Sequence, residues 1–302
     1  MRTLLLFLSR NRRLRRWMES FPLARRLASR FVAGDTLEEA LEVARRINAQ
    51  GIAVTLDHLG ENVTSLEEAE ASRDVYLRVL DEIAARGIQA NVSIKLTQFG
   101  MGLSEAACGQ NVERLVARAA ELRNFVRIDM ESSDYTDRTL RLVENLHARY
   151  GATGTVIQAY LRRSRADVES LSARGIRIRL CKGAYLEPPS AAFPKKADVD
   201  RNYLALMRFL LESGDYPAIA THDEKIIRET ERFAREGKIP RDRFEFQMLF
   251  GIRREMQRRL VAEGYRLRLY VPFGKAWYPY FMRRLAERPA NLFFLIRYGL
   301  RR

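Results

Sequence analysis

From residue 50 onward, hydrophobic and polar positions alternate between two patterns along the chain. Short apolar runs rich in residues that favour β-strands are each followed by a polar junction and then by a longer stretch with helical period. The apolar runs cover residues 52–56, 90–95, 125–130, 155–158, 176–181, 218–221, 244–249 and 267–271. This alternation predicts strands that lie parallel in one sheet and are connected by helices.

The stretches between these runs have the period of amphipathic helices. They cover residues 66–86, 105–123, 136–150, 197–212, 224–236 and 253–263, and Gly87, Gly237 and Gly264 are placed to cap three of them. Eight strand–helix units in about 250 residues is the usual size of a closed (β/α)8 barrel. A doubly wound sheet is the alternative, but no G-x-G-x-x-G follows the first strand.

Composition narrows the class of protein without choosing its chemistry. With 302 residues, of which 47% are apolar, the chain can bury a sizeable core. The two cysteines, Cys108 and Cys181, are too few for a disulfide framework or a thiolate metal site, which fits a reducing cytosol. The net charge of +15 attracts a phosphate-bearing cofactor, a nucleic acid or an anionic lipid.

The positive charge is concentrated at the N-terminus, where residues 1–30 contain nine arginines and one acid, Glu19. The apolar run 4–8 is far shorter than the roughly 20 residues that span a bilayer, and no signal-peptide cleavage site follows it. We therefore expect a cytoplasmic protein with a basic helical arm over residues 1–49 and a barrel over residues 50–302. Two interpretations of the arm stay open: peripheral contact with an anionic membrane, or packing on the barrel.

Polar side chains gather where the predicted strands end. They are Asp57, His58, Lys95, Asp129, Glu131, Gln158, Tyr160, Arg179, Lys182, Tyr185, Thr221, His222, Gln247 and Tyr270. Any one of them is consistent with a hydrogen-bonded residue of the barrel rim. Because barrel enzymes carry their chemistry at the carboxyl ends of the strands, the whole set predicts a polar pocket there.

Two common chemistries find little support in the sequence. The histidines are His58, His147 and His222, and none has the close spacing to a second histidine that metal sites often show. No G-x-S-x-G sequence is present, and neither cysteine has an evident histidine partner. We therefore predict no metal, and neither metal-dependent hydrolysis nor a nucleophilic triad is favoured.

The predicted pocket contains three cations, Lys95, Arg179 and Lys182, together with the acid Asp129. Positive charge beside an isoalloxazine ring stabilises its anionic reduced form, so these residues permit flavin chemistry without requiring it.

A second cluster of polar residues follows the last strand. Tyr280, Arg283 and Arg284 are spaced to share one helical face, and two adjacent guanidinium groups match a carboxylate. Arg-Arg pairs recur elsewhere in the chain, so such a pair alone most often indicates a solvated helical face.

Six short motifs, in one order, together resemble a single enzyme family. They are Q-A-Y at 158–160, R-L-C-K-G-A-Y at 179–185, A-T-H at 220–222, F-Q-M-L-F-G-I-R at 246–253, Y-V-P-F-G at 270–274 and Y-x-x-R-R-x-x-E at 280–287. From about residue 50 to the end, the chain is similar to the proline dehydrogenases, in particular to their compact monofunctional bacterial type.

The resemblance implies a distorted (β/α)8 barrel whose final helix lies over the mouth, with FAD on the strand ends and L-proline stacked on the flavin. The residues it assigns to catalysis are Asp129, Arg179 and Tyr270. Those it assigns to the substrate are Lys95, Tyr280, Arg283, Arg284 and Glu61, the last as a partner of Arg283 in the closed site. Those it assigns to the cofactor are Met130, Gln158, Arg179, Lys182, Gly183, Ala184, Thr221 and His222.

The reaction that the resemblance implies is oxidation of L-proline to Δ1-pyrroline-5-carboxylate, with hydride transfer to FAD and reoxidation by a membrane quinone. The chain departs from the family pattern at Arg288, where many members have Asn, and at Leu186, where some have Trp. The alternatives are another flavin barrel similar to methylenetetrahydrofolate reductase, or a basic lipid- or nucleic-acid-binding module. A nucleic-acid partner is not expected, because no nucleic-acid motif accompanies the charge.

Overall fold

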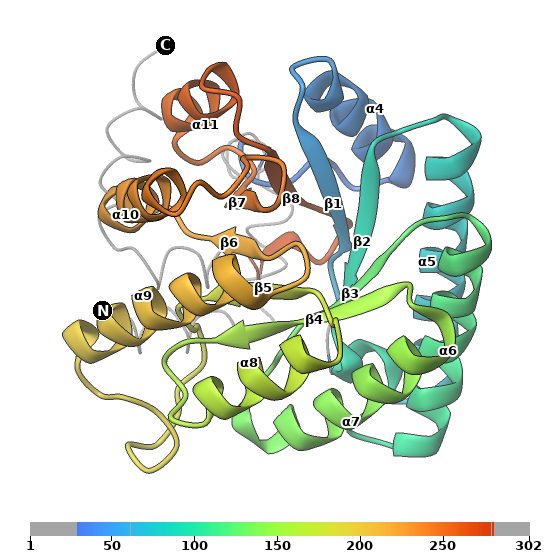
Figure 1. Ribbon diagram of the computed structural model, residues 1–302. Helices are drawn as coiled ribbons and strands as arrows, with labels where there is room; N and C mark the ends of the chain where they lie inside the picture. The colour runs from blue at the N-terminus through green and yellow to red at the C-terminus, as the bar shows by residue number, and fades with distance from the viewer. Residues whose placement is uncertain (1–28, 61, 279, 281–302) are drawn as a thin grey trace.

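Eight parallel strands form a closed barrel in chain order in the computed structural model, which describes residues 29–60, 62–278 and 280 (Figure 1). The strands are β1 Ala53–His58, β2 Ala90–Ile94, β3 Val126–Ile128, β4 Thr153–Gln158, β5 Ile178–Cys181, β6 Ala218–Ala220, β7 Glu245–Leu249 and β8 Leu267–Phe273. The barrel closes where β1 pairs with β8 along its whole length, from Ala53 opposite Arg268 to His58 opposite Phe273. The predicted barrel is confirmed, and the doubly wound alternative is wrong.

Helices surround the barrel and alternate with the strands. They are α4 Leu37–Asn48, α5 Leu66–Ala85, the short 3-10 helix η1 Leu96–Phe99, α6 Glu105–Glu121, α7 Ser133–Tyr150, α8 Ser164–Ala173, α9 Lys196–Ser213, α10 Glu224–Glu236 and α11 Arg254–Ala262. The six predicted helices agree with the structure to within a few residues. The sequence did not indicate α8, because two of its four buried positions carry Ser164 and Asp167 and the apolar period is lost.

Local signals set the helix ends. Thr36 and Glu39 form a reciprocal capping box at the start of α4. At the C-terminus of α10, Gly237 has φ −78, and the left-handed residue that turns the chain is Lys238, with φ 52. The left-handed residue that ends α10 is therefore Lys238, one position after the glycine that the sequence indicated as the cap.

The helix α4 precedes the barrel in sequence but packs on both β1 and β8. A regular (β/α)8 barrel fills this position with the helix that follows β8. The segment before α4 also contacts the barrel, because Ala33 donates its backbone N–H to Pro272 O at 2.8 Å and Gly274 donates to Gly34 O at 2.8 Å. The division at residues 49 and 50 stays a prediction, and α4 packs as part of the helical layer.

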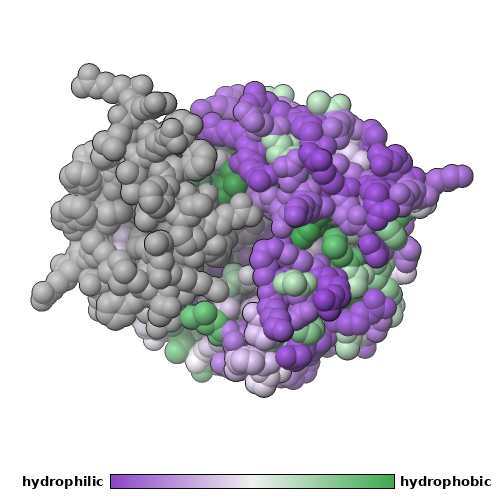
Figure 2. Space-filling view, turned by 90° about the vertical axis from the view of Figure 1, so that its left-hand side faces the viewer, coloured by the Kyte–Doolittle hydropathy of each residue, from purple (hydrophilic) through white to green (hydrophobic). Residues whose placement is uncertain are grey.

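Residues 1–28, which carry most of the basic arm, lie outside the described residues, so both interpretations of the arm stay open. Within the described chain, no helix combines the length and apolar character needed to cross a membrane. Figure 2 shows the side of the molecule that is on the left in Figure 1. The described surface on that side is mainly hydrophilic, with scattered smaller apolar areas.

Because side chains on a strand alternate between two faces, the barrel has an apolar core between strands and helices and a separate interior inside the strands. Outward-facing residues such as Val54, Val92 and Ile128 are fully buried beneath the helices. Inward-facing residues, in contrast, form a polar lower layer inside the barrel: Thr55, Asn91, Arg127, Glu245 and Arg268. Thr55 Oγ1 and Arg268 Nη1 both donate to Asn91 Oδ1, at 2.7 and 3.0 Å, and Arg268 Nε donates to Glu245 Oε1 at 2.8 Å. Thr55, Asn91, Glu245 and Arg268 are thus bonded to one another, which is typical of buried polar groups. Arg127 instead donates from Nη1 to two backbone oxygens, Thr155 O at 2.9 Å and Arg177 O at 2.5 Å.

Candidate active site

The next inward-facing positions on the same strands form a second polar layer at the carboxyl ends. Because side chains on a strand alternate between the two faces, Asp57 lies above Thr55 and Gln247 above Glu245. Asn91 is followed by Ser93 and Lys95, Arg127 by Asp129, and Arg268 by Tyr270. The strand register therefore brings together groups that are far apart in the sequence.

Asp129 is the centre of this layer. Its Oδ1 accepts hydrogen bonds from Arg179 Nη1 at 2.9 Å and from Ser93 Oγ at 2.6 Å, and its Oδ2 accepts from Tyr270 Oη at 3.2 Å. The guanidinium carbon of Arg179 also lies 5.3 Å from the centre of the Tyr270 ring. The three residues predicted to be catalytic are in mutual contact, and their roles stay predictions.

Lys95 connects this cluster to a second carboxylate. Its Nζ lies 3.2 and 3.3 Å from the two oxygens of Asp57 and 3.4 Å from Tyr270 Oη. Asp57 has no exposed surface, and its Oδ1 also accepts from Tyr76 Oη at 3.1 Å. Asp57 therefore fixes the ammonium group beside Tyr270.

The hydroxyl group of Tyr270 is kept protonated by its surroundings. Burial raises its pKa well above the usual value, and the negative charges of Asp129 and Asp57 raise it further. A protonated phenol can donate to Asp129 while it accepts from Lys95. The hydroxyl thus acts as a bridge between a cation and an anion.

Arg179 offers a donor that can meet a cofactor. It is 5% exposed, its Nε donates to Gln247 Oε1 at 2.6 Å, and its Nη1 is bonded to Asp129. Its buried Nη2 has no hydrogen-bond partner among the residues that the structure describes. An unpaired buried donor is costly, so this atom fits an acceptor on a bound group.

The predicted cofactor residues after β4 and β5 contact one another. Ala184 donates its backbone N–H to Gln158 Oε1 at 3.1 Å, and Gln158 Nε2 donates to Glu131 O at 2.9 Å. Gly183 has φ 129, and a Cβ atom there would lie 2.2 Å from the ring of Tyr160. This close approach requires glycine, and residues 183 and 184 are both exposed. Met130, also predicted to contact the cofactor, is 4% exposed.

Lys182 is held by two carboxylates that the sequence did not indicate. Its Nζ lies 2.5 Å from Asp200 Oδ1 and 2.8 Å from Asp223 Oδ2. Burial raises the pKa of each acid, but the hydrogen bonds and charges of Lys182 and Lys196 together with the backbone N–H of Lys225 at Asp223 outweigh it and lower both values. Asp223 also donates its backbone N–H to Thr221 Oγ1 at 3.0 Å, so Lys182 and Thr221 meet at the same acid.

His222 faces a hollow of about 570 Å³ beside the N-terminus of α10. The hollow is lined by His222, Asp223, Glu224, Lys225, Arg228 and Arg253. Leu249 donates its backbone N–H to His222 Nε2 at 2.9 Å, which assigns the imidazole proton to Nδ1. Arg228 and Arg253 both pair with Glu224, at 2.6 and 3.4 Å, so the feature of this hollow that suits an anionic group such as a phosphate is the helix N-terminus.

Some predicted substrate residues cannot be compared with the structure. Glu61, Arg283 and Arg284 lie outside the described residues. Tyr280 is described and is 6% exposed. The carboxylate clamp and its closing acid therefore stay predictions.

Ser93 and Glu245 are not among the polar residues that the sequence predicts for the pocket, and Asp57 and Gln247 are predicted only as members of that set. A signal was available, because two polar residues stand two positions apart in each of β1, β2, β7 and β8, at 55 and 57, 91 and 93, 245 and 247, and 268 and 270. Such a period on one strand face, repeated in several strands, indicates a polar barrel interior. The pairing of these residues still depends on register.

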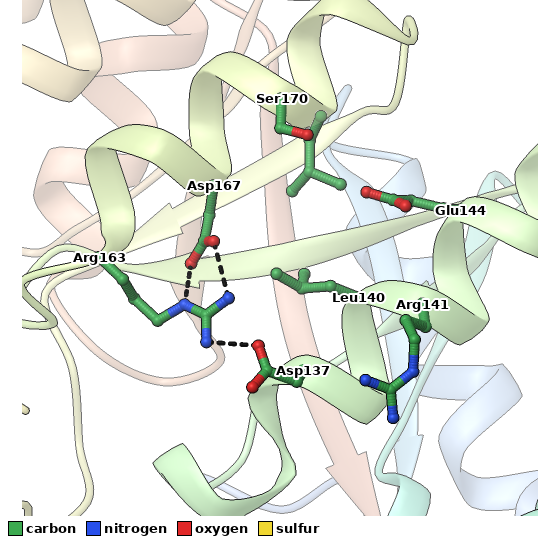
Figure 3. Close-up of a pocket in the computed structure, with 8 residues that line it drawn as sticks. Asp137, Leu140, Arg141, Glu144, Arg163, Asp167 and Ser170 are labelled. Atoms are coloured by element: carbon green, nitrogen blue, oxygen red, sulfur yellow. Dashed lines mark hydrogen bonds and ion pairs between the residues drawn. The ribbon is translucent and has the colours of Figure 1, made fainter.

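A second hollow, of about 200 Å³, lies outside the barrel between α7 and α8 (Figure 3). Arg163 points into it and pairs with Asp137 at 2.5 Å and with Asp167 at 2.8 Å. Arg163 and both of its acid partners are thus ion-paired, and the hollow lies outside the barrel. We assign it no part in the active site.

Fold and site together define a (β/α)8-barrel protein with a charged, hydrogen-bonded pocket on the face where barrel enzymes carry out catalysis. The family model for proline dehydrogenase matches residues 40–297. This chain therefore belongs to the proline dehydrogenase family, whose members are flavin-dependent oxidoreductases.

Two relatives illustrate the likeness. The chain is 44% identical to proline dehydrogenase of Deinococcus radiodurans over 275 residues, which cover 89% of each protein. It is 40% identical to proline dehydrogenase 1 of Bacillus subtilis subsp. natto over 297 residues, which cover 98% of each.

A solved structure has the same barrel. Proline utilization A from Bdellovibrio bacteriovorus, inactivated by N-propargylglycine, superposes with a TM-score of 0.81 at 28% identity. The alignment covers 87% of this chain but only 32% of that longer protein.

Proposed function

We propose that this protein oxidises L-proline to Δ1-pyrroline-5-carboxylate with FAD as the electron acceptor, and that the electrons then pass to a membrane quinone. The observation that carries the proposal is the contact cluster of Arg179, Asp129, Tyr270 and Lys95 at the strand ends of a proline dehydrogenase family barrel. The relatives are named for the same reaction.

The residues at the strand ends fit FAD. When bound, FAD supplies the acceptor for the two electrons of a hydride. Arg179 would donate from Nη2, and the exposed residues Gly183 and Ala184 allow a close approach. The other residues that would hold the cofactor are Met130, Gln158, Lys182, Thr221 and His222.

The substrate would lie over the second polar layer. Proline would lose a hydride from the ring carbon next to nitrogen and a proton from the nitrogen, so that a C=N bond forms. Lys95, Asp129 and Tyr270 would shape the proline site, and Arg283 and Arg284 would bind the carboxylate. Orientation of this kind lowers the barrier without covalent chemistry by the protein.

Glu61 would pair with Arg283 when the site closes, and Tyr280 would complete the wall over the substrate. A site closed in this way excludes water and commits the bound substrate to reaction.

The basic arm would bring the protein to the membrane that contains the quinone. Residues 1–30 combine nine arginines with Leu, Phe and Trp side chains, a composition suited to the surface of an anionic bilayer. We place the protein in the cytoplasm, in peripheral contact with the inner face of the cell membrane.

The test is the visible absorption spectrum of the purified protein before and after anaerobic addition of L-proline. We expect a yellow protein whose flavin absorption bleaches on addition of proline. A colourless protein, or a flavin that proline leaves oxidised and that methylenetetrahydrofolate reduces, would contradict the proposal.

A further inference from the structure

Three polar side chains form a hydrogen-bonded chain from the lower layer of the barrel to the active-site arginine. Gln247 Nε2 donates to Glu245 Oε1 at 2.5 Å, and Gln247 Oε1 accepts from Arg179 Nε at 2.6 Å. Glu245 and Gln247 occupy alternate positions of β7, so both point into the barrel. The three residues are between 3% and 5% exposed, which removes them from competition with water.

The chemistry of the two ends determines how the amide in the middle is turned. A guanidinium group only donates hydrogen bonds, and an ionised carboxylate only accepts them. Gln247 must therefore present its oxygen to Arg179 and its nitrogen to Glu245. The reversed amide would place a donor against a donor and an acceptor against an acceptor.

Glu245 is kept ionised by the lower layer. Burial raises its pKa, but the charge and hydrogen bond of Arg268 and the bond from Gln247 outweigh burial and lower it. Arg268 Nε lies 2.8 Å from Glu245 Oε1, and Tyr216 Oη lies 3.3 Å from Oε2. The carboxylate therefore stays an acceptor at neutral pH.

The orientation of Gln247 is passed to Arg179 because a guanidinium group is planar and rigid. Gln247 holds its Nε, while Asp129 and Ser93 hold its Nη1 at 2.9 and 3.2 Å. With these two nitrogens fixed, the direction of Nη2 is fixed as well. Nη2 is the buried donor without a partner among the described residues.

We propose that Glu245, acting through Gln247, is a positioning residue that orients Arg179 so that Nη2 donates to the bound flavin and stabilises its reduced form. The inference rests on the proposed function, because it takes FAD as the group that Arg179 meets. It assigns to Glu245 and Gln247 an effect on flavin reduction, and none on the binding of proline.

Two variants interrupt the chain at different points. Gln247→Leu keeps a side chain of similar size but removes the acceptor for Arg179 Nε. The double variant Glu245→Leu with Arg268→Met removes the acceptor for Gln247 Nε2 and leaves neither member of the ion pair buried alone. Thr55→Val is the matched control, because Thr55 is fully buried in the same interior and its hydroxyl donates to Asn91 rather than to Arg179, Gln247 or Glu245.

Two measurements separate positioning from a general loss of structure. The first is the midpoint potential of the bound flavin, titrated with a reductant and a reference dye in the absence of proline. The second is anaerobic rapid mixing with proline, which gives the limiting rate of flavin reduction and the Kd for proline separately. Flavin content per protein is recorded for every variant.

We expect Gln247→Leu to lower both the limiting rate and the equilibrium constant for flavin reduction by about tenfold, the effect of one hydrogen bond to a charged group. The double variant should shift both in the same direction. The Kd for proline should change less than about threefold, since the carboxylate clamp is untouched. Thr55→Val should match the wild-type protein.

An unchanged potential and limiting rate in both variants would overturn the inference, as would a raised Kd for proline with an unchanged rate. Loss of flavin from both variants, with Thr55→Val still loaded, would assign the pair to the fold instead. If proline fails to reduce the wild-type flavin, the proposed substrate is wrong, while the potential titration still decides the role of Glu245.

Discussion

Asp129 offers a direct test of how the polar layer holds the active site together. Asp129→Asn preserves the shape of the side chain and one acceptor oxygen but removes the negative charge opposite Arg179. The side chains of Arg179 and Asp129 are only 6% and 15% exposed, so solvent screens their interaction weakly. Two further donors, Ser93 Oγ at 2.6 Å and Tyr270 Oη at 3.2 Å, bind the same carboxylate.

The size of the effect follows from these contacts. Breaking a buried ion pair by removing one partner costs about 3 to 5 kcal/mol, and the remaining amide oxygen of Asn should reduce this to about 2 to 3 kcal/mol. Arg179 would also lose its fixed orientation, so kcat/KM for proline should fall at least about tenfold. Urea unfolding and steady-state oxidation with a soluble dye acceptor measure the two effects.

Asp137→Asn is the control for the same substitution on an exposed ion pair. Asp137 is 67% exposed, and its partner Arg163 keeps a second partner, Asp167 (Figure 3). We expect a loss below about 0.5 kcal/mol and unchanged kinetics. If Asp129→Asn behaves like Asp137→Asn in both assays, the buried pair does not hold the site together.

Three further predictions concern other parts of the molecule. Burial raises the pKa of Cys108 to about 12, so little of its thiol is ionised at pH 8. A thiol reagent should therefore modify the partly exposed Cys181 first. Labelling of Cys108 before Cys181 would show that the burial of Cys108 is not maintained. Gly183→Ala should reduce flavin content, because a Cβ atom would collide with the Tyr160 ring; full loading would mean that the turn relaxes without consequence. A chain that starts at Ser29 should oxidise proline with a soluble dye but no longer sediment with anionic liposomes, whereas full liposome binding by that active protein would refute the membrane role of the arm.

The sequence by itself determined the strand–helix order and thereby the barrel. All eight apolar runs became strands, because each combines β-branched or aromatic residues with a polar boundary that ends the strand. It failed for α8, where Ser164 and Asp167 are buried at positions that normally carry apolar side chains. A periodicity signal records only hydrophobicity, so it misses a helix whose inner face is partly polar.

The sequence also placed Asp129, Arg179, Tyr270 and Lys95 at one end of the barrel, because parallel strands end on the same face. Which of them touch was decided by the tertiary structure. The pairing of Arg179 with Asp129 rather than with Asp57 depends on strand order and register around the closed sheet. Contacts between residues on strands so far apart in the chain have no local signature.

Only the tertiary structure revealed the supporting residues. Asp57 fixes Lys95 across the β1–β2 pair, and Glu245 reaches Arg179 through Gln247. The sequence does not distinguish a carboxylate that lines the substrate pocket from one that holds another side chain in position, because both occupy inward-facing strand positions. Its role follows from the partner that closure of the barrel brings within hydrogen-bonding distance, and that partner is set by the whole fold.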